Sequence, residues 1–468
     1  MPEERGAHAD AIRAHQASLV TTLQASVHTD RALAATVSGA ADQLRDGRRR
    51  LDAIGTELHD AVAAHRTTAW DTPAGARQFQ LFLAAKARDI RRVVADAVAD
   101  DRARAVVLRS LGFDGSGRGR PGPAEQAGPG DLTGVPARVR DRINRQLLAD
   151  DIGRVAGATE AISATDMVRY HNALRVRDGL AVNAGAGPVL LLSYDPAAFG
   201  GRGRAAIAIG DPDTADNTTV LVPGAHSSVR DGYLSHPDGV NLYREVRRAD
   251  PARSNSVIMW MGYHAPDSLL DPQVAQPTSA RAGGRLLAAD INGLRAAHNG
   301  ASHLTVVGHS YGSTTVADAA AGFGMRADDV VLVGSPGTDL ARSAADFHLP
   351  PAGRVYVGAA SSDPIIGFGD EPQLRVPGTP ATVGLGRNPA DDGYGSTRFK
   401  AETPGLTSPM ADHSSYFTPG SESLFSLGDI ASGHGDALAH DHMTAPHRRR
   451  LPAFDPERLR PGTGGHRH

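Results

Sequence analysis

The sequence predicts an α/β domain with a mostly parallel sheet flanked by helices, preceded by an all-α helical region. Seven short apolar runs lie between residues 189 and 358, and they lack the polar-apolar alternation of a sheet with one solvated face. Stretches of helical composition, such as 240–249 and 280–298, separate several of these runs, as in a parallel sheet covered on both faces. The seven expected strands are 189–193, 205–209, 218–222, 256–261, 303–307, 330–334 and 354–358.

The composition describes a chain with ample core and no unusual charge. Of the 468 residues, 40% are hydrophobic and 22% are charged, and the formal net charge is -3, so charge gives no reason to expect a nucleic acid or a membrane surface as partner. The chain has no cysteine, which excludes disulfides, thiolate metal sites and a cysteine nucleophile. Neither a long apolar run nor an apolar N-terminal signal is present, so we expect no membrane span, no ordinary Sec export and a cytoplasmic location.

We expect residues 1–111 to form a helical hairpin. Apolar residues recur at intervals of seven between residues 37 and 58, and a second amphipathic stripe follows between 79 and 98. Pro73 fits the first turn of the second helix, where a missing N–H costs nothing. The apolar face of such a hairpin would allow residues 11–109 to associate with another copy or with a helical partner.

The stretch 70–79, with the sequence WDTPAGARQF, resembles the bend of the small Trp-x-Gly helical proteins that type VII secretion exports. Thr72 stands where that family has its glycine, and no Tyr-x-x-x-acid export signal follows on the second helix. The resemblance implies export by a route that needs no Sec signal. A pairing element without any export role is the alternative, and both stay open.

The rest of the chain divides by composition. Residues 112–134 are rich in Gly, Pro and Arg and predict a linker, whereas 135–186 have the composition of a helical bridging region. The α/β domain is expected over 187–418. Residues 419–468 are poor in periodic apolar residues and rich in His and Arg, so we expect a flexible tail whose histidines fit no defined metal site.

A candidate nucleophile, Ser310, lies between an expected strand and an expected helix. The apolar run 303–307 precedes it, and small, helix-compatible residues follow from 314 to 320. Between them is a Gly-x-Ser-x-Gly motif, which in a nucleophile elbow places the serine on a sharp turn at the carboxyl edge of the sheet. The motif consists of Gly308, His309, Ser310, Tyr311 and Gly312.

A serine hydroxyl needs a base and an orienting acid to act as a nucleophile. On α/β-hydrolase folds these groups follow in the order serine, acid, histidine. Asp363 ends the loop after the expected strand 354–358, with Asp370 in reserve. His413 lies in a short loop after a further expected strand near residues 395–400, and its order and position favour it over His348 and over the histidines of the tail.

An oxyanion pocket needs two backbone N–H donors. The Tyr311 amide, directly after the candidate nucleophile, is the first. The expected strand 218–222 runs into a Pro-Gly turn, and we expect the second donor there, from the Ala225 or the His226 amide.

From about residue 138 to residue 417 the sequence resembles an actinobacterial α/β-hydrolase family whose domain carries only an unknown-function label. The resemblance implies that Ser310, Asp363 and His413 form a catalytic triad and that a helical region precedes the hydrolase. Ala225-His226 stands where the family usually has Thr-Gly. The segments that carry the resemblance are AAIAIGDPDTADNTTVLVPG at 205–224, the elbow GHSYGSTT, Gly334-Ser335-Pro336-Gly337, Ser362-Asp363-Pro364 and His413-Ser414-Ser415-Tyr416.

Together these residues predict a serine hydrolase that cleaves a small-molecule or lipid carboxylic ester through an acyl-enzyme, without a cofactor. An amidase or peptidase would use the same triad. A protein of a different class is the other alternative: a non-catalytic α/β-hydrolase scaffold, or a binding or secretion-related protein whose hairpin pairs with a partner.

Overall fold

The computed structural model divides into two compact units, Met1–Glu125 and Gln126–His468. In the first unit, the structure describes helical residues scattered between positions 46 and 96. In the second unit, it describes residues 135–468 except 158–161, 269–270, 299, 367–373, 376–381, 406–407 and 451–452.

Two ion pairs join helical segments within the first unit. Arg50 pairs with Asp96 at 2.9 Å, and Lys86 pairs with Glu57 at 2.5 Å. Because residue 50 pairs with 96 and the later residue 57 pairs with the earlier residue 86, the two segments run antiparallel. This direction fits a hairpin; the bend at 70–79 lies outside the described residues, and the limits of hairpin and linker stay predictions.

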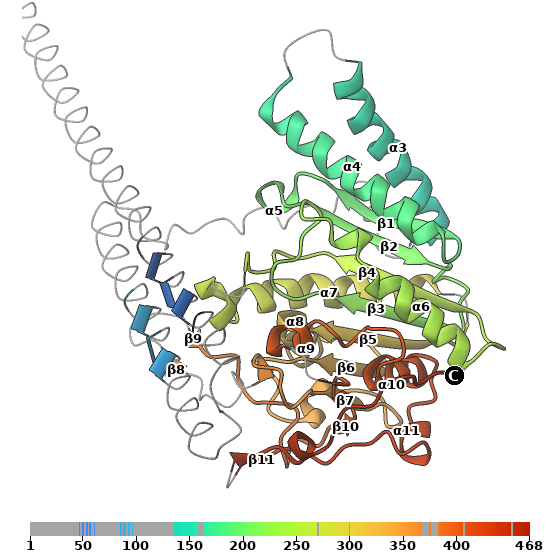
Figure 1. Ribbon diagram of the computed structural model, residues 1–468. Coiled ribbons are helices and arrows are strands. Elements are labelled where there is room, and N and C mark those ends of the chain that lie inside the picture. Colours follow the sequence, from blue (N-terminus) through green and yellow to red (C-terminus); the bar gives the residue numbers. More distant parts are fainter. Residues whose placement is uncertain are drawn as a thin grey trace, which may run out of the picture. The chain divides into compact units, whose positions relative to one another are not determined.

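The second unit is built on an eight-stranded sheet with the strand order β1-β2-β4-β3-β5-β6-β7-β10 (Figure 1). From β4 to β10 every neighbouring pair is parallel, while β2 pairs antiparallel with both β1 and β4. All seven strands expected between residues 189 and 358 are present, which confirms the mostly parallel sheet. The strands are β1 (Val189–Asp195), β2 (Arg204–Ile209), β3 (Asn217–Val222), β4 (Asn255–Met261), β5 (His303–His309), β6 (Asp329–Val333), β7 (Val355–Gly358) and β10 (Thr397–Phe399).

Helices cover both faces of this sheet, as the α/β class requires (Figure 1). Successive β3 side chains enter different cores, because a strand has a two-residue period: Val220 joins one core and Leu221 joins the other. The helices are α7 (Thr278–Ala297) and α8 (Tyr311–Phe323) on one face, and α6 (Asp238–Ala249) and α10 (Glu422–Ala431) on the other.

Two further helices, α3 (Ala137–Ala156) and α4 (Ala164–Ala184), pack against β1 at the edge of the sheet. Asn144 Nδ2 donates to the Leu191 carbonyl at 2.9 Å, and Asp141 Oδ1 accepts from the Leu191 amide at 2.7 Å. These side chains protect an edge whose free polar groups would otherwise invite pairing with other chains. The region expected to bridge two domains therefore packs as part of the sheet unit.

The other α-helices and strands described in the second unit are short: α5 (Ala198–Gly201), β8 (Leu374–Arg375), β9 (Thr382–Val383), α9 (Pro409–His413), α11 (Ala437–His440), β11 (Arg449–Arg450) and β12 (Ala453–Phe454). Among the helices of the described residues, none has the length and apolar character needed to cross a membrane.

The structure corrects the flexible tail predicted for 419–468. α10 buries Leu424 and Ile430 in the core, and the His468 ring stacks on the Phe425 ring with centroids 3.9 Å apart. Within α10, four buried residues recur at helical spacing: Leu424, Leu427, Ile430 and Ala431. This pattern covers only ten residues, and the Gly-, His- and Arg-rich sequence that follows it favours a tail for the whole segment.

Candidate active site

Ser310 lies at the junction of β5 and α8, at the carboxyl edge of the sheet. Its backbone has φ 55° and ψ -132°, a conformation that costs energy for any residue except glycine. A Cβ atom at Gly308 would lie 2.6 Å from the Ser313 Cα, and one at Gly312 would lie 2.4 Å from the Pro223 oxygen. Both distances are too short for real atoms, so this turn requires glycine at both positions, as a nucleophile elbow does.

Asp363 and His413 are in direct contact. His413 Nδ1 donates a hydrogen bond to Asp363 Oδ2 at 2.8 Å, and both side chains are buried. With its proton on Nδ1, the neutral imidazole keeps a lone pair on Nε2 that can act as a base. Tyr416 Oη donates to the same Asp363 oxygen at 2.7 Å and accepts from the Ala360 amide at 3.1 Å. The other oxygen, Oδ1, accepts from the Ile365 amide at 2.9 Å. Three donors therefore orient the carboxylate, and sequence reasoning missed Tyr416 and the Ile365 amide.

The carboxyl ends of β5 and β6 bring Ser310 to this pair. The Ser310 amide donates to the Val333 carbonyl at 2.9 Å. The next residue, Gly334, has φ 56°, and a Cβ there would lie 3.0 Å from Asp363 Oδ2 and 3.1 Å from His413 Cε1. Within the described chain, no hydrogen bond joins Ser310 to His413; in hydrolases this contact commonly tightens when substrate binds.

His309, the residue before Ser310, contacts the loop of the candidate base. Its Nε2 donates to the His413 carbonyl at 2.8 Å, and the two rings lie with centroids 4.9 Å apart. Burial, and after it the charge of His413, lowers the pKa of His309 to about 4. His309 is therefore uncharged at neutral pH and acts as a hydrogen-bond donor that fastens the His413 backbone to the elbow.

The predicted oxyanion donors lie on two sides of Ser310. Tyr311 is the first residue of α8, so its amide has no partner within the helix. Gly224 follows β3, and a Cβ there would lie 2.9 Å from Ser310 Oγ. The turn that leads to Ala225 therefore borders the nucleophile.

The structure corrects one of the two candidates for the second donor. The His226 amide donates to the Pro266 carbonyl at 2.8 Å and so cannot also donate to an oxyanion. In the part of the chain that the structure describes, the Ala225 amide makes no hydrogen bond. Asp370, the reserve acid, lies outside that part. No group of three His, Asp or Glu side chains within it is arranged to hold a metal ion.

Comparison with known proteins identifies the family. Residues 195–374 match the model of an alpha/beta hydrolase family, and residues 5–114 match a domain of unknown function. The uncharacterized protein Rv0963c of Mycobacterium tuberculosis is 36% identical over 240 residues, which cover 48% of this chain and 87% of that protein. The chain belongs to the α/β-hydrolase family and carries a second module ahead of the hydrolase.

A longer relative is the uncharacterized protein Rv2079 of Mycobacterium tuberculosis, 49% identical over 355 residues, which cover 68% of this chain and 54% of that protein. The chain thus spans about half the length of this relative. Among solved structures, esterase LipW from Mycobacterium marinum is similar over 58% of this chain and 91% of its own, with 12% identity and a TM-score of 0.30. An esterase from the archaeon Pyrobaculum calidifontis is similar over 65% and 99%, with 13% identity and a TM-score of 0.30.

Proposed function

We propose that this protein is a serine hydrolase that cleaves a carboxylic ester of a small molecule or a lipid through an acyl-enzyme. The observation that carries the proposal is the juxtaposition of Ser310, His413 and Asp363 at one edge of the sheet. The serine has a strained elbow backbone, and the histidine donates to a buried carboxylate at 2.8 Å. Strain of this kind concentrates at functional sites.

In the proposed mechanism, His413 Nε2 takes the proton of the Ser310 hydroxyl as Oγ attacks the carbonyl carbon of the ester. Asp363 holds the imidazole in the tautomer that leaves Nε2 free, and it stabilises the imidazolium that forms. The Tyr311 and Ala225 amides donate to the tetrahedral oxyanion. The imidazolium then protonates the leaving alkoxide, and water activated by the same base hydrolyses the acyl-enzyme.

Labelling with a serine-directed fluorophosphonate, followed by peptide mass spectrometry, tests this function. We expect one adduct, on Ser310, and we expect Ser310→Ala to lower kcat/KM for a short p-nitrophenyl ester by more than about a thousandfold. Ser302→Ala, at the turn before β5, is the matched control and should keep both labelling and turnover. Undiminished ester hydrolysis by a folded Ser310→Ala variant would contradict the proposal.

Ester and amide substrates need a separate comparison, because both pass through the same acyl-enzyme. We expect a p-nitrophenyl ester to be cleaved faster than the p-nitroanilide of the same acid. A faster reaction with the anilide would assign the protein to the amidases.

We also propose that residues 11–109 pair with a helical partner or with a second copy, since ion-paired, antiparallel segments form a compact unit of their own. Analytical ultracentrifugation of the whole chain should reveal association that a chain lacking residues 1–115 has lost. Association that survives this deletion would contradict the proposal.

A further inference from the structure

Residues 359–363, here called the acid loop, are held at four consecutive positions by four different buried side chains. A loop has few backbone hydrogen bonds of its own, so its position depends on such contacts. These partners therefore help to fix the backbone that carries Asp363. The four pairs are Ala359 with Arg398, Ala360 with Tyr416, Ser361 with Glu402, and Ser362 with Asp412.

Glu402 holds the acid loop with both of its carboxylate oxygens. One accepts from the Ser361 amide at 2.6 Å, and the other accepts from Ser361 Oγ at 2.9 Å. Burial raises the pKa of Glu402, and the two hydrogen bonds from Ser361 act in the opposite direction because they favour the ionised carboxylate. Because Ser361 stands two residues before Asp363, this contact limits the movement of the candidate acid.

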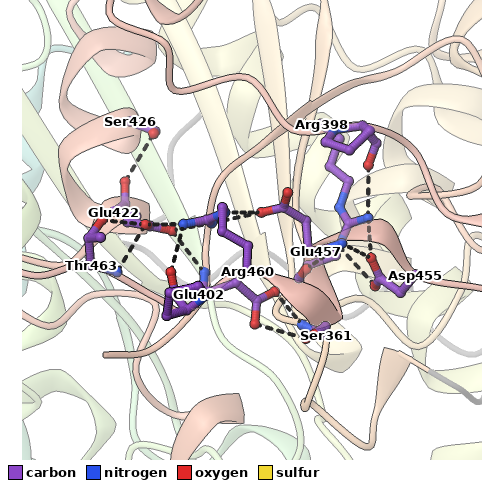
Figure 2. A network of polar contacts seen from close by, with 12 residues as sticks. Ser361, Arg398, Glu402, Glu422, Ser426, Asp455, Glu457, Arg460 and Thr463 are labelled. Carbon is purple, nitrogen blue, oxygen red and sulfur yellow. Dashed lines mark hydrogen bonds and ion pairs between the residues drawn. The ribbon is translucent and has the colours of Figure 1, made fainter. Parts of the chain in front are cut away.

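Residues 453–463, here called the C-terminal strap, hold Arg398 in turn. Asp455 accepts from both terminal guanidinium nitrogens of Arg398, at 2.8 and 3.0 Å (Figure 2). Arg398 Nη2 also donates to the Ala359 carbonyl at 2.7 Å. A continuous chain of hydrogen bonds therefore runs from the strap to the start of the acid loop.

A second chain of contacts starts at Arg460 of the strap. Arg460 donates to both carboxylate oxygens of Glu422, at 2.6 and 2.7 Å (Figure 2). Thr463 Oγ1 donates to Glu422 at 2.6 Å. Glu422 in turn accepts from the backbone amide of Glu402 at 3.1 Å. The strap thus reaches Ser361 through two buried carboxylates.

We propose that the C-terminal strap supports the candidate active site: its Asp455 and Arg460, acting through Arg398 and Glu402 as positioning residues, hold Asp363 where His413 needs it. The inference rests on the proposed function, which assigns the role of acid to Asp363. Buried ion pairs add little stability compared with apolar packing of the same volume, but they fix direction and register. Precise placement matters here, because a displacement of about 1 Å in a catalytic group costs about a hundredfold in rate.

Two variants test the proposal. Glu402→Gln keeps one carbonyl acceptor, so one of the two Ser361 donors loses its partner. Arg460→Lys keeps the charge but cannot make the two-pronged contact with Glu422. Arg458→Lys makes the same change on an exposed arginine of the strap and is the matched control. We expect kcat for a short ester to fall about tenfold to a hundredfold in both test variants, with KM nearly unchanged, and to stay unchanged in the control.

A second readout does not depend on turnover. The proton NMR signal of His413 Nδ1–H lies far downfield while it is bonded to Asp363, and we expect it to shift or weaken in Glu402→Gln and Arg460→Lys but not in Arg458→Lys. Unchanged signal and kcat in folded test variants would overturn the proposal. If the wild-type chain neither hydrolyses esters nor reacts with fluorophosphonate, the proposed function fails, and the NMR comparison alone then decides whether the strap positions Asp363.

Discussion

The substitution Gly224→Ala adds one methyl group next to Ser310 and is the most direct test of the proposed oxyanion loop. A Cβ atom there would lie 2.5 Å from the Ser310 Cβ and 2.9 Å from Ser310 Oγ. It would also lie 3.0 Å from the carbonyl oxygen of His309. Two of these three neighbours are the backbone oxygen and the first side-chain atom of the elbow, which cannot rotate away. Gly224→Ala must therefore push the loop and the nucleophile apart.

The size of the effect follows from these distances. Ordinary contact begins at 3.4 Å, so a separation of 2.5 Å must grow by the difference, about 0.9 Å. The elbow glycines leave Ser310 little freedom, and the loop that carries the Ala225 amide takes up most of the shift. A displacement of about 1 Å costs about a hundredfold in rate, which corresponds to about 2.7 kcal/mol of activation free energy.

The assay is kcat for a short p-nitrophenyl ester, with the rate of fluorophosphonate labelling as an independent measure. We expect both rates to fall about a hundredfold in Gly224→Ala. Gly153→Ala is the matched control, because a Cβ on this residue of α3 meets nothing within 4 Å; it should be neutral for activity and stabilise the helix by up to about 1 kcal/mol. A folded Gly224→Ala protein with wild-type kcat would refute the assignment of the Ala225 amide to the oxyanion pocket.

Two other side chains give further predictions. Tyr416→Phe removes a hydrogen-bond donor to Asp363. We expect kcat/KM to fall about tenfold, since a hydrogen bond to a charged group is worth about 1.5 kcal/mol or more. An unchanged kcat/KM in the folded variant would show that Asp363 does not need this donor. Burial alone would lower the pKa of His468, but hydrogen bonds with Asp429 and Glu245 outweigh it and raise the pKa to about 9. The imidazolium therefore stabilises the fold fully below pH 6.5, and this contribution is lost as the pH rises through about 9. Urea unfolding at about pH 6 and about pH 9.5 measures this loss. Between these two pH values, the free energy of unfolding should fall less in His468→Gln than in the wild-type chain. An equal fall in both proteins would contradict the stabilising role of the His468 imidazolium.

A local sequence pattern made it possible to predict the strands, the elbow and the residues of the candidate site. Buried parallel strands need unbroken apolar runs, and a turn as sharp as that at Ser310 needs glycine two positions to either side. Asp363 and His413 could be located because the carboxyl ends of parallel strands meet at one edge of the sheet. Asp363 and His413 stand 53 and 103 positions after Ser310 in the sequence, and the topology of the sheet brings them to the same edge.

The C-terminal strap could not be predicted in the same way. Arg398 and Asp455 are 57 residues apart, and their contact depends on charge and hydrogen bonding, which have no period along the chain. With 49 basic and 52 acidic residues, the sequence offers no means of choosing which pairs are buried together. A segment rich in Gly, His and Arg is typical of a mobile tail when its partners are unknown, and here those partners are buried carboxylates and a buried arginine.

His226 shows how a backbone conformation decides between two candidates that the sequence leaves equal. It has φ 66°, a left-handed conformation that is uncommon for histidine, and its N–H donates to the Pro266 carbonyl. Its Nδ1 donates to the Asp267 carbonyl at 3.1 Å, so two hydrogen bonds offset the cost of the strained backbone. Of the two amides that follow the turn, that of Ala225 makes no hydrogen bond among the described residues, and this favours it as the proposed oxyanion donor. For this reason the activity of Gly224→Ala distinguishes a turn that supplies an oxyanion donor from a turn with no part in catalysis.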